Sequence, residues 1–508
     1  MSKNGALDLL LVHPGGRAAI YQSLGATLAA IEPPFWAGLM ATLVRRHGFS
    51  VEILDSNAEN LGPEGAAERI KDLAPRLTAV VVYGHNPSAS TQVMPFAGAL
   101  CRTLKEKSPD SKIILVGGHA AALPERTLRE EETDFVAGGE GPYTLVDLLR
   151  SFESPRPDLA KVRSLWYREA GGVRSTPPAP LITDLDGEMP EVAWDLLPME
   201  KYRAHNWHCF GFLDRRQPYA SLYTTLGCPF HCSYCCIQAP FKSGEKTLGY
   251  KETVNSYRLW SPRSVIAQID KLVNRYGVRN IKFADELFVM NRNHVHGICD
   301  LILERGYDLN IWAYARVDTL REDGTLEKLK RAGVHWLCLG FESGSKRVRD
   351  DVKKGYSQEE AYRVVERLEK AGIYIIANYL FGLPEDDLES MQETLSLALD
   401  FNCEFANFYS AMAYPGSRLY HTAVEEGWPL PRGWSGYSQH AADTLPLPTR
   451  HLSGGEVLQF RDHAFQTYFG SPRYLEMIVR KFGEETGRHV REMAGHRLDR
   501  NFLSPARG

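Results

Sequence analysis

The chain lacks the features that would place it in a membrane or an oxidising compartment. Its first apolar run, Leu9–Val12, is far shorter than the roughly 20 residues of a membrane-spanning helix, and Met1–Ala6 shows no signal-peptide core. Nine cysteines among 508 residues do not look like a disulfide framework. We therefore expect no integral membrane segment and a reducing, cytoplasmic setting.

Long runs of one charge are also missing, and the formal net charge is only −4. A nucleic-acid partner is therefore not expected. No Gly-x-Gly-x-x-Gly follows the first predicted strand, which weakens a nicotinamide or flavin interpretation. A chain of 508 residues is too long for one hydrophobic core, so two or three domains are expected.

Residues 1–150 alternate short apolar runs with amphipathic stretches. This pattern predicts a Rossmann-like, doubly wound α/β domain with a parallel sheet. The predicted strands are Leu9–Val12, Val51–Leu54, Ala79–Tyr83, Ile113–Val116 and Phe135–Ala137, with helices such as Ala37–Arg46 and Val93–Lys105 between them. Ligands of such sheets bind beyond the carboxyl ends of the strands. The residues at those ends include His13, Asn57, His85, Ser88, Gly117, Gly118, His119, Gly139 and Glu140.

Proline and charge dominate residues 151–215. Ser154–Pro157 and Pro177–Pro180 punctuate the chain, so we expect a linker between domains here.

Three cysteines, Cys228, Cys232 and Cys235, are spaced Cys-x3-Cys-x2-Cys on one short stretch. Clustered thiolates select iron–sulfur clusters, zinc or copper(I). A closed zinc site needs a further ligand pair, and the sequence offers no Cys-x2-Cys or His-x3-His partner downstream. Three ligands suit a [4Fe–4S] cluster with one iron left open for a second molecule. Three buried cysteines without a metal are the alternative.

Residues 216–425 predict six β–α units, hence a partial (β/α)6 barrel with its site at the carboxyl ends of the strands. The strands are Leu222–Thr225, Asn280–Ala284, Ile311–Ala315, Trp336–Gly340, Ile373–Leu380 and Glu404–Ala411. Ser261 before Pro262 predicts a helix start, and Gly277 a helix end. Polar residues behind these strands are Asp285, Glu286, Arg316, Glu342, Ser343 and Tyr414.

Residues 426–508 predict a mostly helical C-terminal extension. Val457, Phe460, Ala464 and Tyr468 fall on helical spacing. We favour a packed helical cap over substrate recognition.

The cysteine spacing resembles the signature of the radical S-adenosylmethionine (SAM) enzymes. The resemblance implies that Cys228, Cys232 and Cys235 hold a [4Fe–4S] cluster whose open iron binds the amino and carboxylate groups of SAM. It also implies SAM contacts for Asp285 and Glu286 with the amino group, and for Arg316 with the carboxylate. Glu342 and Ser343 would meet the ribose or methionine portion, and Tyr414 would lie near the adenine.

The order of the N-terminal pieces resembles the cobalamin-binding domain that precedes the radical SAM core in one large subfamily. Gly117–His119 followed by Gly139–Gly141 is the most similar part. The resemblance implies that the strand-end residues named above contact cobalamin. One departure is that Asp55–Asn60 lacks the histidine of an Asp-x-His-x-x-Gly motif, so any cobalamin is expected to bind without that ligand on cobalt.

The combined resemblance implies a cobalamin-dependent radical SAM enzyme that methylates an unactivated carbon of a small-molecule substrate. Its electron donor would be a protein such as flavodoxin or ferredoxin. Two alternatives stay open at this point. One is oxidative cyclisation or rearrangement with the same cofactors, and the other is a non-catalytic iron–sulfur protein in a structural or redox-sensing role.

Overall fold

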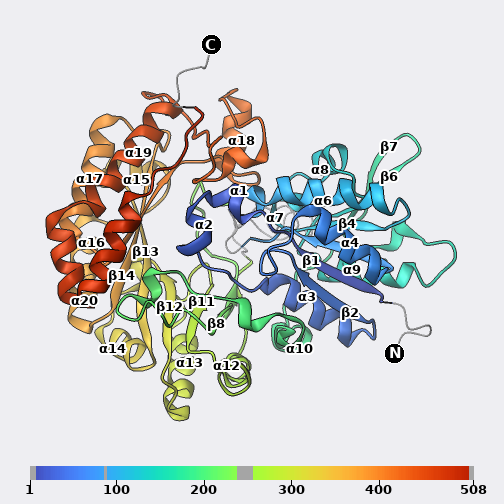
Figure 1. The fold of residues 1–508 in the computed structure, drawn as a ribbon, viewed down its shortest axis with the longest axis horizontal. Coiled ribbons are helices and arrows are strands. Elements are labelled where there is room, and N and C mark those ends of the chain that lie inside the picture. Colours follow the sequence, from blue (N-terminus) through green and yellow to red (C-terminus); the bar gives the residue numbers. More distant parts are fainter. Residues whose placement is uncertain (1–6, 85–88, 237–255, 503–508) are drawn as a thin grey trace.

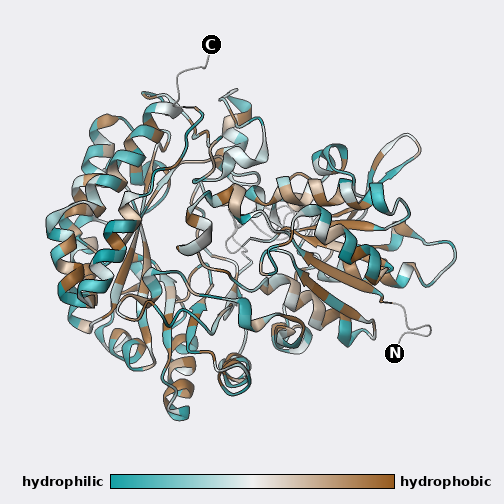
Figure 2. Ribbon diagram, in the orientation of Figure 1, coloured by the Kyte–Doolittle hydropathy of each residue, from teal (hydrophilic) through white to brown (hydrophobic). Residues whose placement is uncertain are grey.

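A computed structural model of the chain describes residues 7–84, 89–236 and 256–502 (Figure 1). These residues contain two large sheets, one built near the N-terminus and one near the middle of the chain. None of the helices within the described ranges is long and apolar enough to cross a membrane. Figure 2 shows that the strands of both sheets are mainly hydrophobic, whereas the surrounding helices carry hydrophilic outer faces.

The first sheet has the order β2-β1-β3-β4-β5-β6-β7. Its parallel part consists of β1 (Leu9–His13), β2 (Val51–Asp55), β3 (Leu77–Val81), β4 (Ile113–Val116) and β5 (Phe135–Ala137). Alternate residues of β1 enter different cores. Leu9 and Leu11 share one with α3 (Phe35–Arg46) and α9 (Pro142–Ser151), while Leu10 and Val12 share the other with α4 (Pro63–Leu73) and α6 (Met94–Lys107). The predicted doubly wound fold is confirmed.

Shorter helices stand between these elements in the chain. They are α1 (Arg17–Tyr21), α2 (Leu24–Thr27), α5 (Ala89–Gln92), α7 (Gly118–Ala122) and α8 (Pro124–Glu130).

Residues 151–215, for which we predicted a linker, contribute a hairpin to the first sheet. β6 (Leu165–Glu169) pairs antiparallel with β5, and β7 (Gly172–Ser175) pairs with β6. The strands are joined at Gly171 and Gly172, whose φ angles of 102° and 145° suit glycine. The rest of the segment, which includes α10 (Leu185–Glu188), buries Trp194, Tyr202 and Trp207.

The second sheet has six parallel strands in sequential order, β15-β14-β13-β12-β11-β8. They are β8 (Tyr219–Leu222), β11 (Asn280–Phe283), β12 (Asn310–Ala315), β13 (Val334–Glu342), β14 (Tyr374–Phe381) and β15 (Phe405–Ser410). This arrangement agrees with the predicted partial barrel. Its first strand starts at Tyr219, three residues before the predicted start. This strand ends at Leu222. Thr225–Leu226 (β9) pair instead with Arg258–Leu259 (β10).

Helices cover the outside of the barrel, as Figure 1 shows. They are α12 (Pro262–Tyr276), α13 (Arg292–Arg305), α14 (Asp323–Arg331), α15 (Lys346–Asp351), α16 (Gln358–Ala371) and α17 (Leu388–Phe401). The caps of α12 are those predicted. The hydroxyl of Ser261 accepts from the backbone N–H of Ser264 at 3.2 Å, and Gly277 ends the helix with a φ of 65°.

The C-terminal extension is helical, as predicted. It contains α18 (Arg418–Glu425), α19 (Gly454–Phe469) and α20 (Pro472–Gly495), which is kinked at Gly483. α19 packs against β15, and the hydroxyls of Tyr468 and Tyr474 donate to the carbonyls of Cys403 and Glu404. The extension therefore covers the last strand of the open barrel.

Candidate functional site

The three cysteines lie on the loop that follows β9, beyond the carboxyl end of β8. All three are half-buried, and none of them forms a disulfide. The backbone N–H of Cys235 donates to the carbonyl of Cys232 at 3.1 Å. Burial raises the pKa of Cys228 to about 11, so a bound metal would have to displace its proton.

Within the described ranges, no group of three or more histidine, cysteine, aspartate or glutamate side chains is arranged around one metal ion. A mononuclear site needs all its ligands about 2.0–2.3 Å from one centre. A four-iron cluster needs each thiolate on a different iron, so its ligands stand farther apart.

Arg316 links the end of β12 to the cysteine loop. Its Nη1 lies 3.8 Å from the sulfur of Cys232, and its guanidinium stacks on the ring of Phe230 at 3.7 Å. Asp318 holds the same guanidinium through two hydrogen bonds of 2.9 and 3.1 Å. The site therefore has one oriented cation beside the cysteines.

Asp285 and Glu286 follow β11 and carry buried carboxylates. Oδ1 of Asp285 accepts from the N–H of Thr224 at 3.0 Å and from the hydroxyls of Thr224 and Thr225 at 2.8 and 2.6 Å. Oδ2 of Asp285 and Oε2 of Glu286 are buried without a partner among the described residues. Burial raises the pKa of Asp285 to about 6 and that of Glu286 to about 7. Two buried acceptors without donors fit a ligand that brings an ammonium group.

Glu342 ends β13 with a positive φ of 59°, next to an irregularity in the pairing with β14. Its carboxylate accepts from Nζ of Lys354 at 2.8 Å in a nearly buried ion pair. A non-glycine residue in this conformation is held there by its surroundings, as often happens at ligand sites.

Ser343 and Tyr414 differ in what they offer. The hydroxyl of Ser343 is fully buried and engaged with Thr394 at 3.1 Å and with the N–H of Ser345 at 3.1 Å. These bonds shape the turn after β13. Tyr414 follows β15, and its half-buried ring lies 6.3 Å from that of Tyr437.

A first cavity lies where the carboxyl ends of the two sheets meet. From the first sheet it is lined by His13, Asn57 and Gly84, and from the barrel side by Ser221, Tyr223 and Ala284. Nδ1 of His13 and Nη1 of Arg17 are buried there without a partner among the described residues. The stacked rings of Trp36 and Tyr83, 4.5 Å apart, form part of the wall. The chain thus offers unused polar atoms and a flat aromatic surface to a large ligand.

The other residues predicted to contact cobalamin do not line this cavity, and two of them, His85 and Ser88, lie outside the described residues. His119 is buried between Thr91, at 3.2 Å, and the ring of Trp434, at 4.3 Å, and burial lowers its pKa to about 3.

The packing of the neighbouring backbone explains the glycine at Gly117, because a Cβ there would lie 2.6 Å from the carbonyl carbon of Val82. Gly118 begins α7, and a Cβ on Gly139 would lie 3.3 Å from the hydroxyl of Ser164. Glu140 forms a buried ion pair with Arg258 of β10 at 2.5 Å. This pair joins the edge of the first sheet to the region of the cysteine loop.

A second, larger cavity of about 540 Å³ occupies the barrel interior. Tyr21, Ala29 and His205 line both cavities, so the two adjoin. At this junction Lys282 of β11 is paired with Glu32 at 3.0 Å, and both side chains are buried. Sequence reasoning missed Glu32, Arg17 and Lys282, because no motif marks them and Lys282 stands within a predicted strand.

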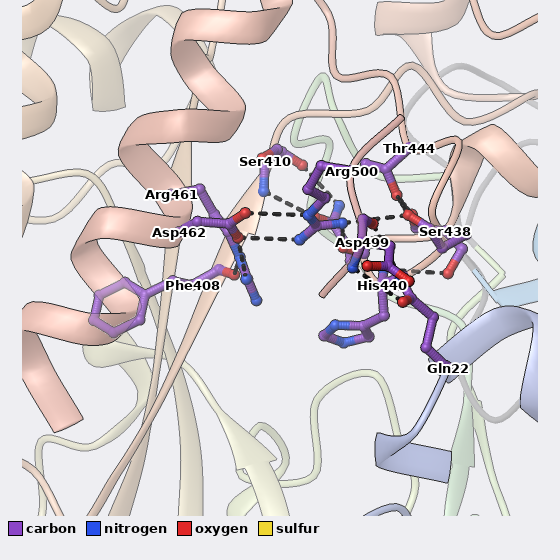
Figure 3. Close-up of polar contacts among 12 residues, drawn as sticks. Gln22, Phe408, Ser410, Ser438, His440, Thr444, Arg461, Asp462, Asp499 and Arg500 are labelled. Atoms are coloured by element: carbon purple, nitrogen blue, oxygen red, sulfur yellow. Dashed lines mark hydrogen bonds and ion pairs between the residues drawn. The ribbon is translucent and has the colours of Figure 1, made fainter. Parts of the chain in front are cut away.

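A group of polar contacts joins the C-terminal extension to the end of α1 (Figure 3), and Gln439, His440 and Asp462 of this group line the second cavity. Gln22 binds the backbone of His440 and Asp499, and the hydroxyl of Ser438 donates to the carbonyl of Ile20 at 3.0 Å. Arg500 bridges the carboxylate of Asp462 and the carbonyls of Gln439 and Ala441. We call these contacts the C-terminal clamp.

Two family models match the chain. The B12 binding domain matches residues 21–149, and the radical SAM superfamily matches residues 222–398. The first match includes the strands from β2 to β5, and the second begins in β8 and contains the cysteine loop.

Relatives and solved structures agree with this order of parts. An uncharacterized methyltransferase of Pyrococcus horikoshii is 28% identical over 92% of this chain and 94% of its own. An anaerobic magnesium-protoporphyrin IX monomethyl ester cyclase of Cereibacter sphaeroides is 26% identical over 89% and 68%. The fold is that of the radical SAM methyltransferase TsrM of Kitasatospora setae, with a TM-score of 0.66, 16% identity and coverage of 97% and 100%.

Both matched models, their order along the chain and the fold lead to one assignment. The chain is a radical SAM enzyme with an N-terminal B12-binding domain.

Proposed function

We propose that this enzyme is a cobalamin-dependent C-methyltransferase that acts on a small molecule. The observation that carries the proposal is the common wall of the two cavities, formed by Tyr21, Ala29 and His205. Methyl transfer requires the methyl donor and the acceptor carbon to meet within bonding reach. A cobalamin site at the edge of the first sheet and a substrate site inside the barrel meet this requirement.

When bound, the cluster supplies the electron that cleaves SAM to methionine and a 5′-deoxyadenosyl radical, and cobalamin supplies the methyl group. Cys228, Cys232 and Cys235 would hold the cluster. The partnerless oxygens of Asp285 and Glu286 would accept hydrogen bonds from the ammonium of SAM. Arg316, held by Asp318, would face the SAM carboxylate.

We assign lesser roles to the remaining predicted SAM residues. Glu342 would reach the ribose from its irregular position at the end of β13, and Tyr414 would border the adenine. Ser343 would support this edge indirectly, since its hydroxyl already binds Thr394 and Ser345.

For cobalamin, we assign contacts to His13 and Asn57, and add Arg17, Trp36 and Tyr83. Gly117, Gly118, His119, Gly139 and Glu140 would shape the strand ends that carry the cofactor. The contacts of the His119 ring with Thr91 and Trp434, which enclose it, argue against its binding cobalt. A small reducing protein such as flavodoxin or ferredoxin would supply the electrons.

The alternative function is a radical cyclisation with the same cofactors. It is favoured by the cyclase of Cereibacter sphaeroides among the relatives of this chain. The two functions differ in the fate of the SAM methyl group, which moves to product in one and stays on methionine in the other.

The test is anaerobic reconstitution with iron, sulfide and cobalamin, followed by reaction with SAM carrying a deuterated methyl group and a chemical reductant. The methyltransferase should yield S-adenosylhomocysteine together with deuterium in the cobalamin fraction, even without substrate. The same preparation should also yield 5′-deoxyadenosine. Deoxyadenosine without either methyl-transfer product would favour cyclisation.

A further inference from the structure

The lining of the barrel cavity narrows the chemistry of the substrate. Its volume of about 540 Å³ is in the range of sites that enclose one small molecule. The cavity has an aromatic part, a band of amides and phenols, and two buried cations that are already paired.

The aromatic part is made by Trp207, Trp312 and Phe405 of the cavity wall. The ring of Trp207 lies 5.2 Å from that of Trp312 and 5.7 Å from that of Phe405. Flat unsaturated groups pack well against such edges and faces. This part of the cavity favours a planar ring.

The polar band is centred on two asparagines in register on β14 and β15. Nδ2 of Asn407 donates to Oδ1 of Asn378 at 2.9 Å, and Nδ2 of Asn378 donates to the sulfur of Cys338 at 3.2 Å. Both amides are half-buried and line the cavity. Within the described part of the chain, Oδ1 of Asn407 has no hydrogen-bond partner. The pair can therefore offer a ligand both an acceptor and N–H donors.

Two buried cations of the wall, Lys282 and Arg461, are matched by carboxylates. Lys282 is paired with Glu32 at 3.0 Å. Arg461 binds the carbonyl of Phe408 at 2.7 Å and the carboxylate of Asp462 at 2.8 Å. At Lys282 and Arg461 an incoming carboxylate or phosphate would meet cations that are already neutralised, and burying such an anion is costly. Arg497, an exposed residue of the C-terminal segment, also lines the cavity.

We propose that the group of the substrate that enters the barrel is an uncharged planar ring bearing an amide or a similar neutral hydrogen-bonding group, held by Asn378 and Asn407. This inference rests on the proposed function, because it describes the molecule that the reaction modifies. It adds that the inner site selects against anions.

A matched pair of probes tests it. Indole-3-acetamide and indole-3-acetate share ring and size and differ only in charge. Binding of each to the full-length reconstituted protein is measured by isothermal titration calorimetry. We expect the amide to bind at least about tenfold more tightly than the carboxylate.

Variants locate the binding. Asn407→Leu should weaken the binding of indole-3-acetamide about tenfold and abolish the difference in affinity between the two probes. Asn274→Leu, at an exposed asparagine of α12, should change neither. Thermal unfolding of each variant establishes that it is folded.

Equal binding of the two probes, absence of binding by both, or an unchanged affinity in folded Asn407→Leu would each overturn the inference. Formation of 5′-deoxyadenosine by the same preparations is recorded in parallel. If 5′-deoxyadenosine forms at the normal rate while the probe results contradict the inference, the proposed substrate class is wrong and the proposed function is not affected.

Discussion

At the residue scale, Asp285 combines a satisfied and an unsatisfied oxygen in one buried carboxylate. Oδ1 has three donors from Thr224 and Thr225, and Oδ2 has none among the described residues. An asparagine would keep the first oxygen and remove the charge. We expect Asp285→Asn to weaken SAM binding at least about tenfold, since the acceptor for the ammonium is lost. Calorimetric titration with SAM measures this.

The same substitution should stabilise the empty protein at high pH. Burial raises the folded pKa of Asp285 from 3.8 to about 6, so its ionisation opposes folding increasingly as pH rises from about 4 to 6. Above pH 6 the penalty approaches about 3 kcal/mol at most, and it vanishes below pH 4. Thermal unfolding should show Asp285→Asn above the wild type at pH 8 and level with it near pH 4.

Asp386 is the matched control for that stability prediction. Its pKa is likewise raised to about 6 by burial, but both of its oxygens accept hydrogen bonds, from Gly382, Leu383 and Ser390. Asp386→Asn should also gain on the wild type between pH 4 and 6, but it should be the less stable protein near pH 4, because the amide nitrogen cannot accept the hydrogen bonds of the oxygen that it replaces. Equal stability of Asp285→Asn and Asp386→Asn near pH 4 would contradict the account given for Asp285.

The cysteines give a second prediction at this scale. Cys232→Ser should lower bound iron several-fold and abolish 5′-deoxyadenosine, because a hydroxyl is a poor ligand for iron in a cluster. Cys236→Ala, beside the third cysteine, should leave both nearly unchanged. Iron and sulfide analysis after anaerobic reconstitution measures the first effect. Loss of iron in Cys236→Ala, with Cys232→Ser unaffected, would refute the assignment.

The sequence predicts those site residues that a motif or a strand end marks, which include the cysteines, Asp285 and Arg316. It does not reveal that Ser343 and Glu140 have local partners, because those partners, Thr394 and Arg258, are distant in sequence. Nor does it reveal Arg17, whose buried guanidinium faces the first cavity only after the chain has folded. The spacing of residues along the sequence cannot reveal roles that depend on tertiary contacts.

At the scale of elements, the sequence predicts the bounds of helices and strands well where local chemistry sets them. The bounds of β4 and β5 match the predicted strands, and Ser261 and Gly277 cap α12 as predicted. The prediction fails where the pairing of a strand with a distant partner sets its place in a sheet. Thr225 extends the predicted first strand in sequence, yet it pairs with β10, and the β6–β7 hairpin forms because β5 offers an edge.

The buried pair Glu32–Lys282 joins two elements far apart in sequence, the segment before α3 and strand β11. Removing Lys282 takes the ammonium group away from the buried carboxylate of Glu32, which keeps His205 at 3.7 Å. We expect Lys282→Met to lower the free energy of unfolding by roughly 3–5 kcal/mol, and the double variant with Glu32→Gln to recover much of this loss. Denaturant unfolding of the full chain measures both.

An exposed pair serves as control for this prediction. Arg45 and Asp195 are 2.9 Å apart with side chains about two-fifths exposed. Arg45→Met should cost no more than about 1 kcal/mol, since water screens the charges. A cost for Lys282→Met as small as this would mean that the buried pair does not hold the junction of the cavities together.

At the scale of the whole molecule, the C-terminal clamp joins the two ends of the chain across the barrel. Gln22 lies near one end and Arg500 near the other, and both bind the segment around His440 (Figure 3). Because Arg500 is 7% exposed and satisfies Asp462 and two carbonyls, its loss leaves several buried groups unpaired. The clamp should then open more often.

We expect Arg500→Met to speed amide hydrogen exchange about tenfold or more in residues 436–445 and 20–28, while β13 and β14 stay protected, since opening is local to the clamp. Arg473, at the start of α20, donates to the carbonyls of Leu399 and Asp400. Arg473→Met removes these contacts and should leave the exchange rates of both segments unchanged. Exchange measured by mass spectrometry on the full chain distinguishes the two. If exchange rises evenly over the molecule in Arg500→Met, Arg500 serves global stability, and the two segments are held together by something other than this clamp.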